Sequence, residues 1–338
     1  MINRAFSVAP MIDWTDRHER YFLRLISKHA VLYTEMLTTG ALLHGQYERF
    51  LKYDATEHPL ALQLGGSDPH ELAACAKMAV NFGYDEINLN VGCPSDRVQS
   101  GRFGACLMAV PKQVADCVAA MCDAVDIPVT VKHRIGIDDR DSWDTLCEFI
   151  ETVAQGGCEV FIVHARKAWL NGLSPKENRE VPPLQYDVVY RLKQTYPQWQ
   201  FILNGGINDI QTAQQQMLYV DGVMLGRTAY HEPYLLAQVD AVFFNDTHVI
   251  PDRCKIVEQL LPYIENEIAA GTKLHAITRH ITGLFNGLPG ARVWRRTLSE
   301  QATKYPADIS VVTRALAQLH CQTNLMLISE PADLRTTY

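Results

Sequence analysis

Short apolar runs rich in β-branched residues recur along the first part of the chain, and each is followed by a stretch long enough for a helix. Eight such runs occur, at 6–10, 31–35, 60–64, 86–90, 128–132, 160–164, 201–204 and 222–225. The intervening stretches 69–81 and 111–124 have helical periodicity and open with a proline, which suits a first helical turn. Eight strand–helix units predict a (β/α)8 TIM barrel. A doubly wound parallel sheet is the alternative.

The strand pattern ends near residue 245, and four helical stretches follow at 252–270, 274–286, 289–302 and 308–328. The first opens near Asp252, stops at Gly271 and has Ile256, Leu260 and Ile264 at helical spacing. We therefore expect a barrel domain at 1–245 and a small all-α helical bundle at 246–338.

The composition narrows the protein class. Nine cysteines, an odd number without a CxxC pair, argue against a disulfide framework or a zinc site and fit a reducing cytosol. The chain has no basic leader running into an apolar segment, and no apolar run approaches the roughly 20 residues that span a bilayer. We expect a cytoplasmic protein with no membrane contact, no bound metal and no protein partner.

The net charge of −7 would argue against a nucleic-acid partner. The charge is uneven, however. The segment 273–304 contains six lysines and arginines and only one acid, Glu300. A local basic face is therefore expected within an acidic protein.

Polar residues end several of the predicted strands. Gln63, Asn90, Lys132 and His164 each close or nearly close an apolar run. Taken singly, each has a structural explanation, since a lysine at a strand end can reach solvent and a lone histidine is usually a satisfied core residue. In a barrel, however, all strand ends meet at one rim, where active sites lie. Their convergence predicts a binding site.

Glycines follow the last two strands, at Asn204-Gly205-Gly206 and at Gly226-Arg227. Barrels often bind phosphate at these two loops, because glycine lets backbone N–H groups approach an anion and arginine pairs with it. A single Gly-Gly would be read as a tight turn. The two loops together predict a phosphorylated ligand.

Lys132 lies in an otherwise apolar strand, where an unpaired ammonium is costly, so we expect it to face a delocalised anion or an acceptor. The N1–C2=O edge of a reduced flavin is such an acceptor. Gln63 could hydrogen-bond the opposite polar edge, and Pro10, Met11 and Ile12 could pack along the ring. No GxGxxG follows a strand, which disfavours a Rossmann-bound dinucleotide.

Cys93 differs from the other cysteines, most of which lie in helical patterns. It lies between Gly92 and Pro94, just beyond the fourth strand, so its thiol should point over the barrel mouth. An ordinary thiol is mostly protonated at neutral pH, and it can serve as a proton donor as readily as a nucleophile. The nearby Cys106 has no predicted role.

These segments resemble a known family. The motifs are Phe6-Ser7-Val8-Ala9-Pro10-Met11, Leu62-Gln63-Leu64-Gly65-Gly66, Asn88-Leu89-Asn90-Val91-Gly92-Cys93-Pro94-Ser95, Val131-Lys132-His133-Arg134-Ile135-Gly136 and His164-Ala165-Arg166. In this order they are similar to the tRNA-dihydrouridine synthases, and residues 172–180 resemble the A subfamily. The wider family often has His-Gly-Arg where this chain has His164-Ala165-Arg166, a departure that fits the A subfamily.

The resemblance implies an FMN enzyme that reduces the C5=C6 bond of uridines 20 and 20a in the tRNA D-loop. NADPH would reduce the flavin and leave before tRNA enters. Hydride from flavin N5 would add at C6, and Cys93 would give the proton to C5. By the same likeness Asn90 contacts the uridine. The residues implied to hold FMN are Pro10, Met11, Ile12, Gln63, Lys132, His164, Asn204, Gly205, Gly206, Gly226 and Arg227.

A target base within folded tRNA must be splayed into the pocket while the protein grips the surrounding phosphates. Arg292, Arg295 and Arg296 fall at i, i+3 and i+4, on one side of the third tail helix. Such a charge run is ordinarily a solvated face, but the local basic balance and the resemblance favour contact with the D-loop and elbow region of tRNA. Lys176 and Arg179, in the subfamily stretch, are further candidates.

Three other functions remain open from the residues alone. A flavin barrel that reduces a small unsaturated carbonyl compound would use the same lysine and phosphate loops, but it leaves the arginine helix unexplained. A non-catalytic RNA-binding barrel predicts a colourless protein. A lyase with Lys132 as a Schiff base predicts the absence of flavin.

Overall fold

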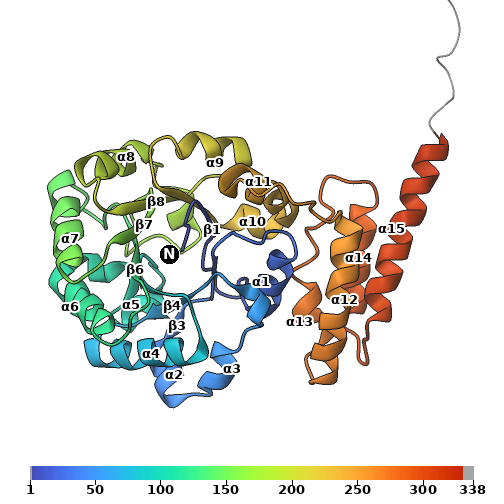
Figure 1. Cartoon of the computed structure of the whole chain (residues 1–338), viewed down its shortest axis with the longest axis horizontal. Coiled ribbons are helices and arrows are strands. Elements are labelled where there is room, and N and C mark those ends of the chain that lie inside the picture. Colours follow the sequence, from blue (N-terminus) through green and yellow to red (C-terminus); the bar gives the residue numbers. More distant parts are fainter. Residues whose placement is uncertain (1, 330–338) are drawn as a thin grey trace, which may run out of the picture.

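The computed structural model describes residues 2–329, whose strands form a barrel of parallel strands (Figure 1). Neighbouring strands follow the order β1-β9-β8-β7-β6-β5-β4-β2, and β3 pairs with β4. Two backbone hydrogen bonds, from Val8 N to the Val31 carbonyl and from Val31 N to the Phe6 carbonyl, close the circle beside β1. The strands are β1 Phe6–Val8, β2 Leu32–Tyr33, β3 Leu37–Thr38, β4 Leu60–Gly65, β5 Glu86–Val91, β6 Val129–Arg134, β7 Val160–His164, β8 Gln200–Asn204 and β9 Gly222–Leu225.

All eight expected strands are present, and the TIM barrel is confirmed. Two expected bounds were too long. The run 6–10 ends as a strand at Val8, because Pro10 has no N–H for a ladder and the chain turns at Met11, whose carbonyl accepts from Trp14 and Thr15. The run 31–35 is reduced to β2, and the short strand β3 was not foreseen.

Helices pack around the outside of the strands (Figure 1). The α4 helix shows why they form where they do: the Asp68 side chain accepts from the His70 and Glu71 N–H groups, Pro69 occupies the first turn, and Gly83 ends the helix with φ of 90°. The helices of this part are α1 Arg17–Arg24, α2 Thr39–His44, α3 Tyr47–Leu51, α4 Pro69–Phe82, α5 Asp96–Ser100, α6 Pro111–Cys122, α7 Trp143–Gln155, α8 Tyr186–Thr195, α9 Ile210–Gln216, α10 Arg227–His231 and α11 Val239–Phe244. Short 3₁₀ helices lie at Ala55–Glu57, Gly104–Ala109, Glu177–Arg179 and Pro233–Gln238.

Side chains alternate along each strand between the outer face of the barrel, which the helices cover, and the barrel interior. Side chains such as Ile87, Leu89 and Val91 of β5 belong to the large buried cluster shared with the helices. A second, smaller buried cluster gathers side chains from several strands, including Ala9, Tyr33, Ala61, Ile162 and Met224. The residues that alternate with the helix-facing ones therefore fill the barrel itself, and near the strand ends they become polar.

Four further helices follow the barrel: α12 Arg253–Ala269, α13 Leu274–Thr278, α14 Ala291–Gln301 and α15 Ser310–Ser329. The expected helix at 274–286 ends at Thr278. Beyond it the chain passes close to the barrel at Gly283, where an added Cβ would lie 2.3 Å from the His231 carbonyl oxygen. Within this bundle, the fully buried Trp294 packs against Phe285 and donates from Nε1 to the Ile281 carbonyl. Residues 330–338, also assigned to the bundle, lie outside the described part of the chain.

The bundle is attached to the barrel through the segment around α1. Arg17 pairs with Glu267 of α12, and Asp16 accepts from Arg279 at 2.7 Å and from His280 at 3.0 Å. Tyr263 of α12 stacks on Tyr21 of α1, with ring centroids 3.9 Å apart. The segment that starts at Trp14 in the barrel mouth therefore also contacts the bundle. We propose a domain boundary at residue 245, where Asn245 ends α11 with φ of 55°.

No helix among residues 2–329 combines the length and the apolar character that crossing a bilayer requires.

Candidate active site

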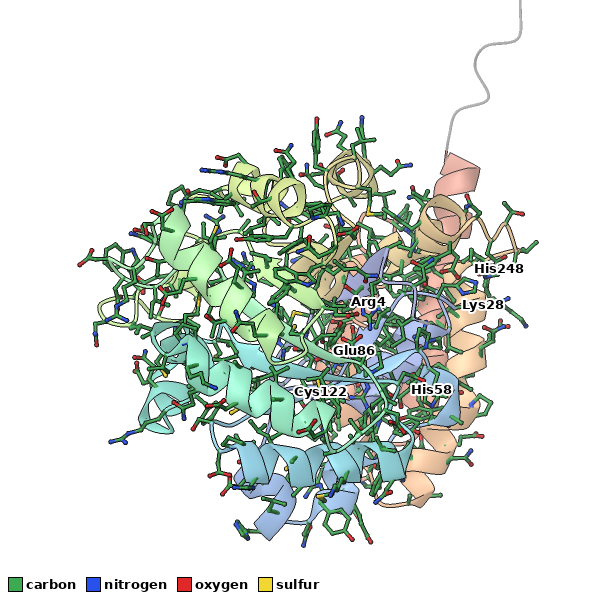
Figure 2. The ribbon with its side chains drawn as sticks, turned by 60° about the vertical axis from the view of Figure 1, so that its left-hand side comes forward. Arg4, Lys28, His58, Glu86, Cys122 and His248 are labelled. Carbon is green, nitrogen blue, oxygen red and sulfur yellow. The ribbon has the colours of Figure 1, made fainter. Side chains whose placement is uncertain are left out.

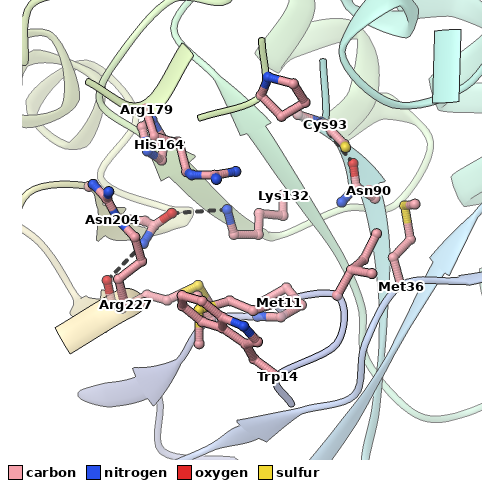
Figure 3. Close-up of a pocket in the computed structure, with 18 of the residues that line it drawn as sticks. Met11, Trp14, Met36, Asn90, Cys93, Lys132, His164, Arg179, Asn204 and Arg227 are labelled. Atoms are coloured by element: carbon pink, nitrogen blue, oxygen red, sulfur yellow. Dashed lines mark hydrogen bonds between the residues drawn. The ribbon is translucent and has the colours of Figure 1, made fainter. Parts of the chain in front are cut away.

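A cavity of about 500 Å³ opens at the carboxyl ends of the barrel strands (Figure 3). Its size suits a cofactor together with part of a substrate. All eleven residues expected to hold FMN line it, and so do Cys93, Asn90 and Arg179. Figure 3 shows Cys93, Lys132, Asn204 and Arg227 around the same space, carried by different strands and loops. The convergence expected from the strand ends is therefore present.

The strand register places three polar side chains next to each other. Lys132 on β6 is paired with Ile162 on β7, and His164 on β7 is paired with Asn204 on β8. Lys132 Nζ donates to Asn204 Oδ1 at 2.9 Å, and Asn204 Nδ2 donates to the Met224 carbonyl at 2.8 Å. The amide of Asn204 is thus held by β9 and turns its oxygen toward the lysine. The half-buried Lys132 has a neutral partner where an ammonium largely removed from water would normally have a carboxylate.

The cavity is electropositive. Burial and the neighbouring Arg134 guanidinium lower the pKa of Lys132 to about 7. Burial, Arg134 and Lys132 together hold the pKa of His164 well below its ordinary value, so its imidazole is neutral, and its Nδ1 is buried without a hydrogen-bond partner. Asp13 is the only acid among the lining residues. An anionic ligand would supply the missing negative charge.

The glycine loops supply the backbone for an anion site. Gly205 and Gly206 have φ of 112° and 70°, and an added Cβ at Gly206 would lie 2.3 Å from Leu184 Cδ1. Only glycine fits this turn. Beyond β9, Gly226 precedes α10, and Arg227 pairs with Glu180 at 2.6 Å. A bound phosphate would compete with Glu180 for this exposed arginine.

Cys93 lies on a tightly held loop between β5 and α5. Its backbone N–H donates to Asn90 Oδ1 at 3.0 Å, and its carbonyl accepts from Ala105 N at 2.9 Å. The thiol is half-buried, lies 3.4 Å from Ser95 Oγ, and is the only thiol in the lining. The loop therefore fixes the Cys93 thiol at the cavity wall.

Cys106 belongs to the segment that supports this loop. Its Sγ donates to the Phe103 carbonyl at 3.1 Å, and burial raises its pKa. An added Cβ at the adjoining Gly104, which has φ of 74°, would lie 2.6 Å from the Cys93 carbonyl oxygen. This close approach explains the glycine, and Cys106 itself lies outside the cavity lining.

Several lining residues were not anticipated from the sequence. Arg134 is buried and donates to the carbonyls of Gly92, Lys167 and Asn178, which ties three loops together. The alternation from Lys132 to Arg134 on one strand was a signal that could have found it. Trp14, which stacks on Tyr230 at 4.4 Å, was assigned no place in the cavity. Met36 gave no such signal, because only the fold brings it to the mouth.

Four predicted tRNA contacts lie outside the cavity. Lys176 is exposed on the loop that also carries Arg179. The α14 arginines, Arg292, Arg295 and Arg296, are all exposed, and Arg295 hydrogen-bonds to Asn286. These four residues therefore lie on the protein surface and do not line the cavity.

Comparison with known proteins agrees with this architecture. A naphthoyl-CoA reductase structure, "2-Naphthoyl-CoA Reductase-2-Naphthoyl-CoA complex", matches with a TM-score of 0.56 at 10% identity over 71% of this chain and 51% of that one. At that identity the likeness concerns the fold alone.

Sequence relatives are much closer. The tRNA-dihydrouridine(20/20a) synthase of Shewanella oneidensis is 61% identical over 96% of both chains. The proteins of the same name from Vibrio parahaemolyticus and Escherichia coli K12 are 58% and 60% identical, over 94% and 92% of this chain and 98% and 90% of their own. The family model "Dihydrouridine synthase (Dus)" matches residues 7–320. The chain therefore belongs to the dihydrouridine synthase family.

Proposed function

We propose that this protein is an FMN-dependent tRNA-dihydrouridine synthase that reduces the C5=C6 bond of uridines 20 and 20a in the D-loop, with NADPH as the reductant. The observation that carries the proposal is the single cavity in which a thiol, an ammonium and two glycine loops face the same space. The names of relatives about 60% identical over most of the chain support it.

The cavity residues fit FMN. The phosphate would bind at Gly205, Gly206, Gly226 and Arg227, where backbone N–H groups and a guanidinium are available. The ring would lie against Pro10, Met11 and Ile12, with Lys132 and Gln63 at its polar edges and His164 beside it. The positive charge without a counter-ion and the unpartnered His164 Nδ1 favour an anionic, acceptor-rich ligand. FMN bound there would supply hydride chemistry for the reduction at C6 of the uridine.

Cys93 would supply the proton that completes the reduction at C5. Its loop is fixed by Asn90 and by Ala105, so the thiol is held in place before the substrate enters. The second N–H hydrogen of the Asn90 amide is available to a uridine carbonyl, which would orient the base. Ser95, 3.4 Å from the sulfur, offers a route for reprotonation of the thiolate.

The tRNA would be gripped on both sides of the cavity. Arg179 lines the mouth and Lys176 lies exposed on the same loop, while the exposed α14 arginines come from the bundle beyond α1 (Figure 1). Such contacts to phosphates would hold the D-loop and elbow region while one base is splayed into the cavity. The bundle would then serve as the tRNA-binding domain.

A double replacement of Arg292 and Arg295 by alanine is expected to weaken tRNA binding about tenfold at moderate salt, because contacts to phosphates are lost. The dependence of the affinity on salt should also become weaker, and FMN should stay bound. Lys112→Ala, an exposed lysine on α6 of the barrel, is the matched control. Filter binding across a salt series measures both quantities. Unchanged affinity and slope would remove α14 from the interface.

The alternative function, reduction of a small unsaturated carbonyl compound, is not favoured, because the close relatives bear the tRNA synthase name. We also propose a cytoplasmic location, supported by eight described cysteines that are all free. The sequence features suggest no protein partner.

Absorbance of the purified protein tests the proposal. A flavin spectrum is expected that NADPH bleaches without oxygen and that unmodified tRNA restores. A colourless protein that binds no FMN would contradict it and favour a non-catalytic barrel. Reoxidation by small enones with no response to tRNA would favour the alternative.

A further inference from the structure

The inward side of β5 is polar along its whole length. Glu86, Asn88 and Asn90 alternate with the outward Ile87 and Leu89, and all three are nearly or fully buried. TIM barrels usually fill these layers with branched aliphatic side chains. Of the three, only Asn90 lines the cavity, so Glu86 and Asn88 lie outside the candidate active site. Buried polar groups of this kind must find hydrogen-bond partners.

At the far end from the cavity, Glu86 is paired with Arg4 (Figure 2). The guanidinium lies 2.6 Å from Glu86 Oε2, and Tyr33 donates its hydroxyl to Oε1 at 2.8 Å. Thr130 Oγ1 also lies 2.8 Å from Oε1. A carboxylate paired with a guanidinium accepts hydrogen bonds and cannot donate them. The direction of every bond that leads away from Glu86 is therefore set.

Thr130 has one hydroxyl hydrogen, and the carboxylate is a closer acceptor than the Ile87 carbonyl at 3.3 Å. With its hydrogen given to Glu86, the threonine oxygen accepts from Asn88 Nδ2 at 2.9 Å. The side-chain oxygen of Asn88, Oδ1, is then left to accept from Gln63 Nε2 at 2.7 Å. Each hydrogen bond thus determines whether the oxygen or the nitrogen of the next side-chain amide faces its partner.

The same direction follows from the cavity end. Gln63 Oε1 accepts from Asn90 Nδ2 at 2.9 Å. Asn90 Oδ1 accepts from the backbone N–H groups of Gly92 at 3.1 Å and Cys93 at 3.0 Å. A backbone N–H can only donate, so the Asn90 amide is fixed from this side as well. Both ends agree, and each of the two cavity amides keeps one unpaired N–H hydrogen.

We infer that Thr130 and Glu86 are positioning residues: through Asn88 they fix the amides of Gln63 and Asn90, so that both present hydrogen-bond donors to the cavity and Asn90 holds the Cys93 loop. This inference rests on the proposed function for the roles of Gln63, Asn90 and Cys93. The chain of hydrogen bonds runs from the Arg4–Glu86 pair, one strand length below the mouth, to the backbone of the proposed acid. Polar chains of this kind are effective only when every member is satisfied.

Thr130→Val tests the inference, because valine keeps the shape and removes the hydroxyl. We expect dihydrouridine formation in saturating tRNA to fall about tenfold, with flavin reduction by NADPH changed less than twofold. In the cofactor-free protein, alkylation of the Cys93 peptide by iodoacetamide should rise about threefold relative to the Cys147 peptide, since its loop loses a fixed support. Thr130→Ser should restore both values to within about twofold of wild type.

Ser7→Ala is the matched control, because it removes a buried hydroxyl on β1 that donates to the Val223 carbonyl outside this chain of bonds. Should Thr130→Val not fold, Asn88→Leu interrupts the same path with the same expectations. Wild-type values for Thr130→Val in both assays would overturn the inference. Losses in Thr130→Ser and Ser7→Ala as large as those in Thr130→Val would overturn it as well. If wild type itself forms no dihydrouridine, the proposed function fails, and the alkylation comparison still judges the positioning role.

Discussion

Replacing Cys93 by alanine is expected to lower dihydrouridine formation about a thousandfold, while FMN binding and its reduction by NADPH persist. Cys93 is the only thiol in the cavity lining, and its backbone is held at both the N–H and the carbonyl. Ser95 Oγ lies 3.4 Å from the sulfur, but an alcohol is a much weaker acid than a thiol and cannot replace it. The residual rate would come from water.

Cys106→Ala is the control for this variant. Cys106 belongs to the neighbouring 3₁₀ helix, is half-buried and lies outside the cavity lining, so its loss should change the rate less than about threefold. Single-turnover reoxidation of the reduced enzyme by unmodified tRNA separates the two half-reactions. Wild-type reoxidation in Cys93→Ala would show that the proton comes from another group.

Replacing Lys132 by methionine is expected to weaken FMN binding about 100-fold and, at the same time, to stabilise the cofactor-free protein. The lysine donates a hydrogen bond to the neutral Asn204 amide, and burial together with Arg134 lowers its pKa to about 7. An ammonium in this cavity is therefore destabilising until an anion binds. Methionine fills the same space without that charge.

Protonation of Lys132 makes the stability of the cofactor-free protein depend on pH. Between pH 7 and the ordinary lysine pKa of 10.5, the unfolded chain carries the proton on Lys132 and the folded, cofactor-free protein does not. The contribution of Lys132 to stability therefore rises with pH across this window, and its penalty is complete below pH 7. Lys132→Met should gain about 2 kcal/mol at pH 6, and the gain should shrink as the pH approaches 10.

Chemical denaturation of the cofactor-free proteins at pH 6 and 9, with FMN titrations by fluorescence, measures both effects. Lys167→Met is the control, because Lys167 lies nearby but pairs with Asp141 at 2.8 Å and does not line the cavity. It should lose a little stability and keep FMN. Loss of stability at pH 6 in Lys132→Met would show that the Lys132 ammonium does not destabilise the cofactor-free protein.

Much of the fold could be predicted from local pattern. The bounds of β7 and β9 match the apolar runs, and the α12 helix begins after Asp252, whose side chain accepts from the Lys255 N–H. These features depend on neighbouring residues. The short strand β3 could not be predicted this way, because it depends on pairing with β4, which lies far along the chain. Nor could the course of the chain beyond α13, where Gly283 passes close to the His231 carbonyl.

The site shows the same division. The rule that strand ends of a barrel share one rim was enough to gather Lys132, His164 and Asn204. It did not show that Lys132 would lack a carboxylate partner or that Arg227 would pair with Glu180, since both depend on side chains from other loops. The polar alternation of β5 was visible in the sequence, but its partners on β4 and β6 require the register.

Mass spectrometry of tRNA after incubation with the purified protein, FMN and NADPH tests the proposed uridine reduction. Unmodified tRNA transcripts should gain 2 Da at uridines 20 and 20a and at no other position, and transcripts with cytidine at both sites should gain nothing. Wild-type protein that binds FMN and oxidises NADPH, yet leaves both uridines unreduced, would contradict the proposed reduction of uridines 20 and 20a.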